Sequence, residues 1–111
     1  MKFSFNIVFV LSTYNYRGRG MKIEVRWKRS DIEHIAKHGV RAEEVEEVLR
    51  DKHLFHWRAR YKGVICDYFL GSSFGRLLIL IAKYDKKIRK FRIKTVRDAN
   101  RHEKKLYKEK R

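Results

Sequence analysis

The chain has 111 residues, of which 43% are hydrophobic and 14% aromatic. This length fits one domain, and this composition excludes a disordered tail. The net charge of +16 favours a polyanionic partner, because so much self-repulsion gives no advantage to an enzyme of neutral metabolites. The single cysteine, Cys66, excludes an internal disulfide and a cysteine-rich zinc site. No apolar run approaches the ~20 residues of a membrane-spanning helix, so we expect a cytoplasmic protein with no membrane partner.

The positive charge is concentrated in the C-terminal half of the chain. Residues 1–20 carry a net charge of +3, residues 21–56 are neutral, and residues 57–111 carry +13. Such an asymmetry between the two halves is typical of a surface that faces nucleic acid.

The N-terminal segment differs from the rest of the chain. Residues 3–11 are apolar, aromatic and strand-like, but only Lys2 precedes them and no small-residue cleavage site follows, so they make a poor signal peptide. A flexible basic linker comes next. We therefore expect residues 1–20 to be an extension and residues 21–111 to be the domain, with its natural start at Met21. The alternative is an additional β-strand.

A strand and two helices are predicted before the basic half. Residues 21–27 have the pattern of a strand. Ser30 and Glu33 have the spacing of a capping box, which predicts a helix that ends at Gly39, the residue expected in a left-handed cap. A second helix is predicted from about residue 42 to 50, because its glutamates favour the positive end of the helix dipole and its valines form an apolar stripe.

Four strands and a last helix are predicted for the basic half. Alternating apolar and polar residues separated by hairpin-length turns place the strands at Leu54–Tyr61, Val64–Leu70, Arg76–Tyr84 and Ile88–Arg97. Residues 77–82 are apolar on both faces, which predicts a central strand. A cap at Asn100 begins a short basic helix through Lys110. This order predicts an α+β fold, an antiparallel β-sheet with two N-terminal helices packed on it and a short C-terminal basic helix.

Three segments of this domain resemble the BrnT toxins, a family in the RelE/ParE superfamily of type II toxin–antitoxin systems. The resemblance covers residues 21–107, in the same order and spacing. It is carried by Trp27 with residues 31–40 (DIEHIAKHGV) and 42–49 (AEEVEEVL), by residues 75–78 (GRLL), and by residues 92–93 (RI) and 96–107 (VRDANRHEKKLY).

Some positions depart from the family's pattern. Lys28 stands where an acidic residue is usual, Val96 where a small residue is usual, and Arg41 with Ala42 where a different helix cap is usual. Asn100 replaces a threonine cap and can act as a cap itself. These changes leave the basic residues of the motifs intact.

The resemblance implies a RelE-like fold and the function of a small endoribonuclease toxin that inhibits translation. It also implies a cognate BrnA-like antitoxin as partner, RNA as substrate (including ribosome-bound mRNA), and a dimer or a toxin–antitoxin hetero-oligomer. Relatives in the superfamily cleave mRNA without a metal by activating the ribose 2′-OH against the adjacent phosphate. No cofactor is therefore expected. His34 and His38 are spaced like a metal-binding pair, but no third ligand has metal-site spacing.

Such chemistry requires a phosphate clamp, a proton acceptor and a donor for the leaving 5′ oxygen. Arginine can serve as the clamp, and histidine, glutamate and tyrosine can carry protons. The resemblance implies the following catalytic candidates: Arg97, Arg76, His38, His102, Glu103 and Tyr107.

A second set of basic residues is predicted to bind the RNA backbone. We expect the cations of two strands to cover one face of the sheet, because acidic residues are nearly absent from this part of the sequence. The RNA-binding candidates are Lys37, Arg58, Arg60, Lys90, Arg92, Lys94, Arg101 and Lys104.

Several catalytic candidates also have structural interpretations. His38 precedes the Gly39 cap, where an imidazole can donate to the last carbonyls of a helix. Glu103 is explained by capping alone, and Tyr107 has the pattern of a core anchor. Arg97 is a fork for the scissile phosphate beside a helix N-terminus, or one more exposed arginine, or an arginine that pairs with a glutamate of the second helix. Two other functions stay open: a non-catalytic RNA- or DNA-binding module of the same fold, and a partner of an acidic protein.

Overall fold

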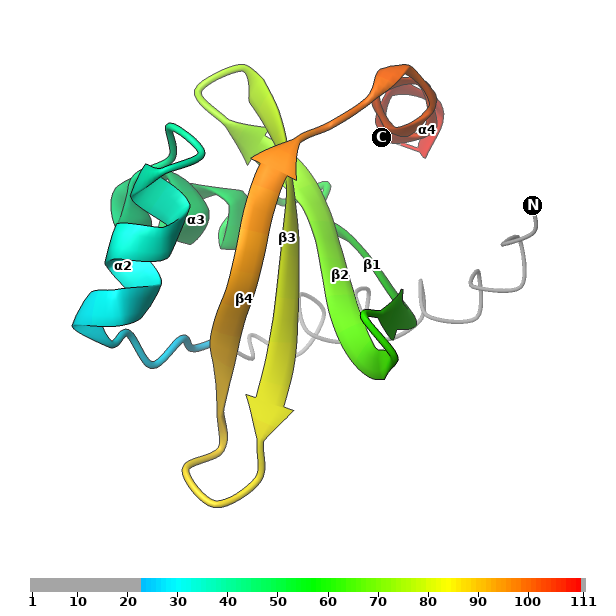
Figure 1. The fold of residues 1–111 in the computed structure, drawn as a ribbon. Helices are drawn as coiled ribbons and strands as arrows, with labels where there is room; N and C mark the ends of the chain where they lie inside the picture. Colours follow the sequence, from blue (N-terminus) through cyan, green and yellow to red (C-terminus); the bar gives the residue numbers. More distant parts are fainter. Residues whose placement is uncertain (1–22, 111) are drawn as a thin grey trace.

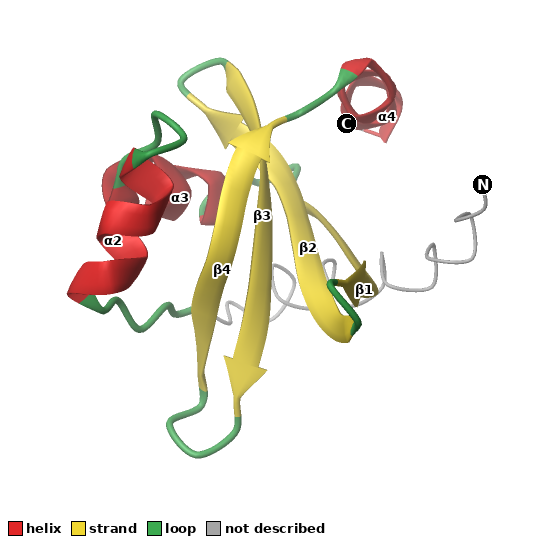
Figure 2. Ribbon diagram, viewed as in Figure 1, coloured by secondary structure: helices red, strands yellow, loops and turns green. Residues whose placement is uncertain are grey.

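The computed structural model describes residues 23–110. The predicted extension at residues 1–20 and the predicted start at Met21 lie outside this range. Three helices and four strands are present in the described part (Figures 1 and 2). In chain order they are α2 (Arg29–Ala36), α3 (Ala42–Leu49), β1 (Phe55–Tyr61), β2 (Val64–Ser73), β3 (Arg76–Asp85), β4 (Lys90–Asp98) and α4 (Arg101–Lys110).

The four strands form one antiparallel sheet in the order β1-β2-β3-β4. Glycines permit the first two turns, because Gly63 and Gly75 have φ angles of +83° and +90°, which side chains disfavour. Leu80 and Ile79 of β3 are fully buried on opposite faces, which confirms the prediction of a central strand. The α+β prediction, with two N-terminal helices and a C-terminal helix, is therefore confirmed.

The segment before α2 pairs with the sheet at one point. Val25 forms a parallel bridge with Phe91 of β4. The amide of Arg26 donates to the Phe91 carbonyl, and the Phe91 amide donates to the Glu24 carbonyl, both at 2.8 Å. Within residues 23–27, the strand expected over residues 21–27 is thus a single bridge.

The N-terminus of α2 differs from the prediction. The helix begins at Arg29, so Ser30 lies inside it and the expected capping box of Ser30 and Glu33 is wrong. The carboxylate of Asp31 instead accepts a hydrogen bond of 3.1 Å from the Lys28 amide. This carboxylate has the reciprocal role that was predicted for Glu33. The predicted end is confirmed, since Gly39 has a φ of +73°.

Helices cover the two faces of the sheet unequally. Helices α2 and α3 lie on one face and α4 lies over one end of the other (Figure 1). Under α2 and α3, the core includes Ile35, Val45, Val48, Phe69 and Leu80. A Cβ at position 71 would lie 3.0 Å from a Val48 methyl and from the Val48 carbonyl oxygen, so Gly71 allows α3 to approach β2 closely.

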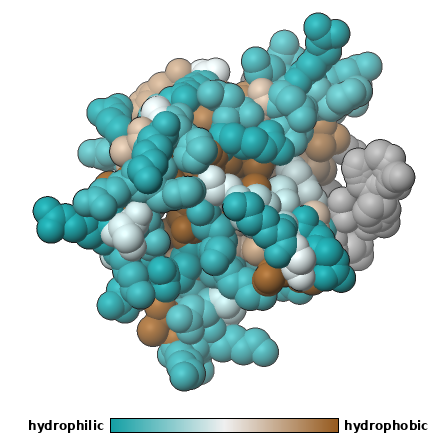
Figure 3. Space-filling view, viewed as in Figure 1, coloured by the Kyte–Doolittle hydropathy of each residue, from teal (hydrophilic) through white to brown (hydrophobic). Residues whose placement is uncertain are grey.

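The opposite face, which we call the α4 face, has its own apolar cluster. Tyr107 of α4 and Ala99 pack with Phe55, Leu70 and Ile79 of the sheet. Farther from α4 on this face, Cys66 and Ile81 are buried, while Trp57, Tyr61 and Tyr68 are partly buried. Hydrophilic side chains cover most of the molecular surface seen in Figure 3, with small separate apolar patches.

Candidate nucleic-acid interface

Arg97 lies on the α4 face at the end of β4. The strand register shows this, because Arg97 is opposite Ile79, and Ile79 is opposite Leu70 on its other side. Ile79 and Leu70 both belong to the apolar cluster of this face. Residues directly opposite each other in neighbouring strands share a face of the sheet. Arg97 therefore stands beside the base of α4, next to the apolar cluster.

The guanidinium group of Arg97 forms a two-pronged pair with Glu103 of α4. The nitrogen–oxygen distances are 2.7 Å and 2.8 Å. The Arg97 side chain remains 43% exposed, whereas Glu103 is 15% exposed. This hydrogen bond is the main cause that raises the pKa of Arg97. Burial alone would raise the pKa of Glu103, but the bonds from Arg97 and from the Asn100 amide outweigh it and lower this pKa.

Glu103 also completes the cap of α4. Its carboxylate accepts from the Asn100 amide at 2.8 Å, and its own amide donates to the Asn100 side chain at 2.8 Å. The predicted capping interpretation of Glu103 is confirmed. The prediction that Arg97 pairs with a glutamate of the second helix is wrong in its partner, which belongs to α4. The structure thus brings two catalytic candidates together, and one partly neutralises the other.

Aromatic side chains adjoin Arg97 on the α4 face. Trp57 of β1 stacks on Tyr68 of β2 with ring centroids 5.5 Å apart and planes tilted by 25°. Burial raises the pKa of Tyr68, and the charge of Arg97 opposes this rise. Both rings, and Tyr61 beside them, are partly exposed. Partly exposed aromatic rings beside cations are the usual platform for unstacked bases.

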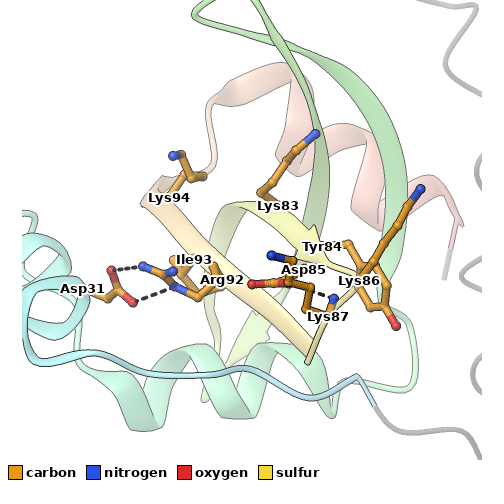
Figure 4. Close-up of a pocket in the computed structure, with 9 residues that line it drawn as sticks. All are labelled: Asp31, Lys83, Tyr84, Asp85, Lys86, Lys87, Arg92, Ile93 and Lys94. Carbon is orange, nitrogen blue, oxygen red and sulfur yellow. Dashed lines mark hydrogen bonds and ion pairs between the residues drawn. The ribbon is translucent and has the colours of Figure 1, made fainter. Parts of the chain in front are cut away.

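Two lysines extend the positive charge of the α4 face. Burial raises the pKa of the Cys66 thiol, and the charges of Lys83 and Lys94 partly oppose this rise. The Lys83 ammonium group donates to the carbonyl of Ile65, the residue before Cys66, at 3.1 Å. Lys83 and Lys94 are exposed and point to the same side of the sheet in Figure 4. Lys94 was predicted to bind RNA, whereas Lys83 was not.

The exposed face of α4 adds four further cations. A shallow depression there is lined by Arg101, Lys104, Lys105 and Lys108. Arg101 and Lys104 were predicted to bind RNA, and both are exposed. The helix thus forms a basic border of the α4 face.

Arg76 is held by acidic and backbone groups of three elements. Its guanidinium donates to Asp98 at 2.9 Å and 3.2 Å, to Glu44 of α3 at 3.2 Å, and to the Gly39 carbonyl at 3.0 Å. The bond to Asp98 is the main cause that raises the pKa of Arg76 and lowers that of Asp98. Arg76 therefore ties the start of β3 to the helix layer and to the end of β4.

Tyr107 is a buried contact between α4 and the loop after α3. Its hydroxyl donates to Asp51, and only 5% of the residue is exposed. It belongs to the apolar cluster of the α4 face. This position agrees with the interpretation of Tyr107 as a core anchor.

The remaining proton carriers and Lys37 are exposed. His38 follows α2, and its ring lies edge-on to that of His34 at 5.2 Å. His102 lies in the first turn of α4 and is exposed. Lys37, at the C-terminal cap of α2, is exposed as well. Within residues 23–110, no hydrogen bond or ion pair joins His38 or Lys37 to Arg97.

The predicted cations of β1 and β4 do not share one face. The register across the sheet places Arg58 on the face under α2 and α3. It is opposite Asp67, which is opposite Ala82, and Ala82 and its partner Ile93 belong to the core on that face. Because side chains alternate along a strand, Arg58 and Arg60 lie on that face. Lys90 points to the other face of the edge strand, opposite Asp85, as does Lys83, whereas the guanidinium of Arg92 turns to Asp31 of α2. The expectation of one continuous cationic face that includes Arg58 and Arg60 is therefore wrong.

A buried ionic cluster beside β1 was not predicted from the sequence. His56 is 1% exposed, its Nε2 lies 2.7 Å from Asp67, and its ring stacks on Phe69. Arg58 donates to the same Asp67 oxygen at 3.2 Å. Burial would raise the pKa of Asp67, but the bonds and charges of His56 and Arg58 outweigh it and lower this pKa. The signal was present as the only acidic residue in β2, directly opposite Arg58.

Comparisons with family models and with curated proteins identify no related protein. A scan against models of known protein families gives no match, and a search of curated proteins gives no significant match. Among residues 23–110, no three histidine, cysteine, aspartate or glutamate side chains are grouped to hold a metal ion. In the same range, no helix has the length and apolar character needed to cross a membrane.

Proposed function

We propose that the chain is an RNA-directed toxin of the BrnT-like kind, with a RelE-like fold, whose α4 face binds RNA. The observation that carries this proposal is the arrangement around Arg97. A half-exposed guanidinium and a pair of stacked aromatic rings lie on one sheet face bordered by a basic helix. This combination binds phosphates and unstacked bases together, as single-stranded RNA requires.

Arg97 is the best-placed residue to act on a reacting phosphate. Its planar fork already binds a carboxylate with two parallel hydrogen bonds, a geometry that also fits a phosphate. A phosphate would take the place of Glu103, whose released carboxylate would then lie beside the substrate as a proton acceptor. His102, on the same helical turn, supplies a second exposed proton carrier.

Arg76 and Tyr107 are assigned structural roles in this proposal. The donors of Arg76 point to two carboxylates and a carbonyl oxygen, and the hydroxyl of Tyr107 points to Asp51. The proposed reaction is attack of the ribose 2′-oxygen on the adjacent phosphorus, with loss of the 5′-oxygen leaving group. The products are a 2′,3′-cyclic phosphate and a 5′-hydroxyl.

The test compares cleavage with binding for purified Arg97 variants. Arg97→Ala should lower cleavage on the order of 10²–10³-fold, because a preorganised donor acts mainly on the transition state, while RNA affinity changes little. Arg97→Lys should not restore cleavage, since an ammonium group cannot form the fork. Cleavage is measured on end-labelled RNA with and without ribosomes, and toxicity by growth arrest on induction. A folded Arg97→Ala protein of unchanged toxicity would refute the assignment.

A non-catalytic RNA-binding module is the second candidate. It is favoured by the Arg97–Glu103 pair, which neutralises the proposed clamp in the free protein. If the wild-type protein binds RNA tightly but leaves it intact, with and without ribosomes, this second function is the correct one. A short reading frame next to this one that encodes an acidic or DNA-binding protein would favour the toxin with a BrnA-like antitoxin.

A further inference from the structure

A groove beside the β3–β4 hairpin collects positive charge at a distance from Arg97. Two carboxylates also line it, those of Asp31 and Asp85 (Figure 4). The five cations that line the groove are Lys83, Lys86, Lys87, Arg92 and Lys94.

The acidic residues leave most of this charge uncompensated. Asp31 lies 3.4 Å from two nitrogens of Arg92, and Asp85 accepts a hydrogen bond from the Lys87 amide at 2.9 Å. Within residues 23–110, no carboxylate is within salt-bridge distance of Lys83 or Lys94. Lys83 is directly opposite Arg92 in the sheet, but its ammonium group donates to the Ile65 carbonyl at 3.1 Å while Arg92 turns to Asp31. An anion bound in the groove would neutralise the charges of Lys83 and Lys94.

A β-bulge gives Lys94 its position. Ile81 is opposite Thr95 and Ala82 is opposite Ile93, so Lys94 is the extra residue of β4. Bulges redirect side chains and are frequent beside functional sites. In Figure 4, Lys94 and Lys83 point to the same side, away from the Asp31–Arg92 pair.

An aromatic ring at the groove favours RNA over a simple anion. Tyr84 is 41% exposed, and its ring is supported edge-on by Phe91 at a centroid distance of 5.0 Å. A supported, exposed ring next to lysines can stack on a base while the ammonium groups bind its phosphates. Duplex RNA offers no such unstacked base.

We infer that the groove is a second binding site for single-stranded RNA, which holds phosphates outside the reacting position. This inference rests on the proposed function and extends it. Lys94 is three residues before Arg97 on β4, or about 10 Å along the strand. RNA bound at Arg97 can therefore continue along β4 toward the hairpin. The groove strengthens binding but takes no part in the reaction.

The first experiment tests the groove without RNA. Inorganic tripolyphosphate is titrated into isotope-labelled protein, and backbone amide shifts are recorded by NMR. We expect the amides of residues 83–94 to shift, and the double variant Lys83→Gln/Lys94→Gln to lose this response. The control Arg41→Gln/Lys52→Gln removes the same charge at the two ends of α3 and should keep the response. Shifts confined to α4, or no shifts, would overturn the inference.

The second experiment identifies RNA as the ligand. A 2′-O-methylated RNA of about twelve nucleotides measures binding without cleavage. The variant Lys86→Gln/Lys87→Gln, which removes two groove cations of the hairpin turn, should lower its affinity and reduce the slope of log affinity against log salt by about two, while cleavage of unmodified RNA at saturation stays unchanged. Equal loss of saturated cleavage would place the lysines in the reaction site and overturn the inference. Tripolyphosphate binding without any RNA binding would instead refute RNA as ligand and the proposed function together.

Discussion

Tyr107 of α4 donates a hydrogen bond of 2.5 Å to Asp51, although the two residues are 56 positions apart. The same carboxylate oxygen accepts from the Ser72 amide at 2.8 Å, and the other accepts from the His53 amide at 2.8 Å. Asp51 therefore joins the last helix, the loop after α3 and the end of β2. This carboxylate fixes the position of α4, which carries Glu103 and the basic border of the candidate site.

Removal of the Tyr107 hydroxyl should weaken the attachment of α4. Tyr107→Phe leaves the ring in the apolar cluster but removes a hydrogen bond to a charged group, so the free energy of unfolding should fall by about 1.5–3 kcal/mol. Tyr84→Phe, which alters a partly exposed hydroxyl, should change it by less than about 0.5 kcal/mol. Urea denaturation measures both values. Equal effects of the two variants would contradict a structural role for this bond.

Loss of the Glu103 charge should have a pH-dependent effect on stability. The pKa of Glu103 is lowered in the folded protein, so its carboxylate stabilises the fold above its ordinary pKa of 4.5, and this contribution is lost as the pH falls through the folded value. Glu103→Gln should therefore be less stable than the wild type at pH 7. The difference should shrink as the pH falls below 4.5. Thermal denaturation over this range tests it, with the exposed Glu109→Gln as the control that should show no such trend.

Loss of Asp67 should lower stability more than loss of its exposed partner Arg58. Asp67→Ala leaves the buried His56 without this carboxylate, and should cost about 3 kcal/mol or more. Arg58→Gln removes the partner whose side chain is 57% exposed, and should cost less than about 1 kcal/mol. Guanidinium denaturation of the two variants gives the comparison. A larger loss for Arg58→Gln would mean that the exposed arginine, not the histidine, holds Asp67.

Arg76 should contribute to stability and not to cleavage. Because its donors point to Asp98, Glu44 and Gly39, Arg76→Ala should lower the free energy of unfolding by about 1–2 kcal/mol, a value discounted for its partial exposure. Arg76→Lys should recover only part of this loss. Cleavage per folded molecule should be unchanged in both variants. A folded Arg76→Ala protein without cleavage would return Arg76 to the reacting site.

Binding of RNA to the α4 border should depend strongly on salt. Log affinity should fall linearly with log salt concentration, because phosphate neutralisation releases counterions. Replacing both Arg101 and Lys104 with Gln should reduce this slope by about one for each lost phosphate contact. Fluorescence anisotropy with labelled RNA measures the slopes. An affinity that does not depend on salt would favour an acidic protein as the partner.

Local patterns in the sequence were sufficient to predict the helices and strands and their order along the chain. Alternating side chains placed the four strands to within a few residues, and Asn100 with Glu103 placed the cap of α4, because these signals act between residues close in the chain. The start of α2 was missed by two residues. There, Asp31 binds both the Lys28 amide and Arg92, which is 61 positions away, and so the start depends on a partner that local patterns do not reveal.

The sequence determined where the positive charge lies along the chain, but only the tertiary structure decided which of the cations lie together. Strand alternation assigns each side chain to one of two faces, and pairing across strands then decides which residues are neighbours. The register places Arg58 and Lys94 on different faces of the sheet. It places Lys83 on the same side as Lys94, and it contains a bulge at Lys94. The partners of Arg97 and Arg76 were likewise decided by packing, because a long cationic side chain pairs with whichever carboxylate the fold brings within reach.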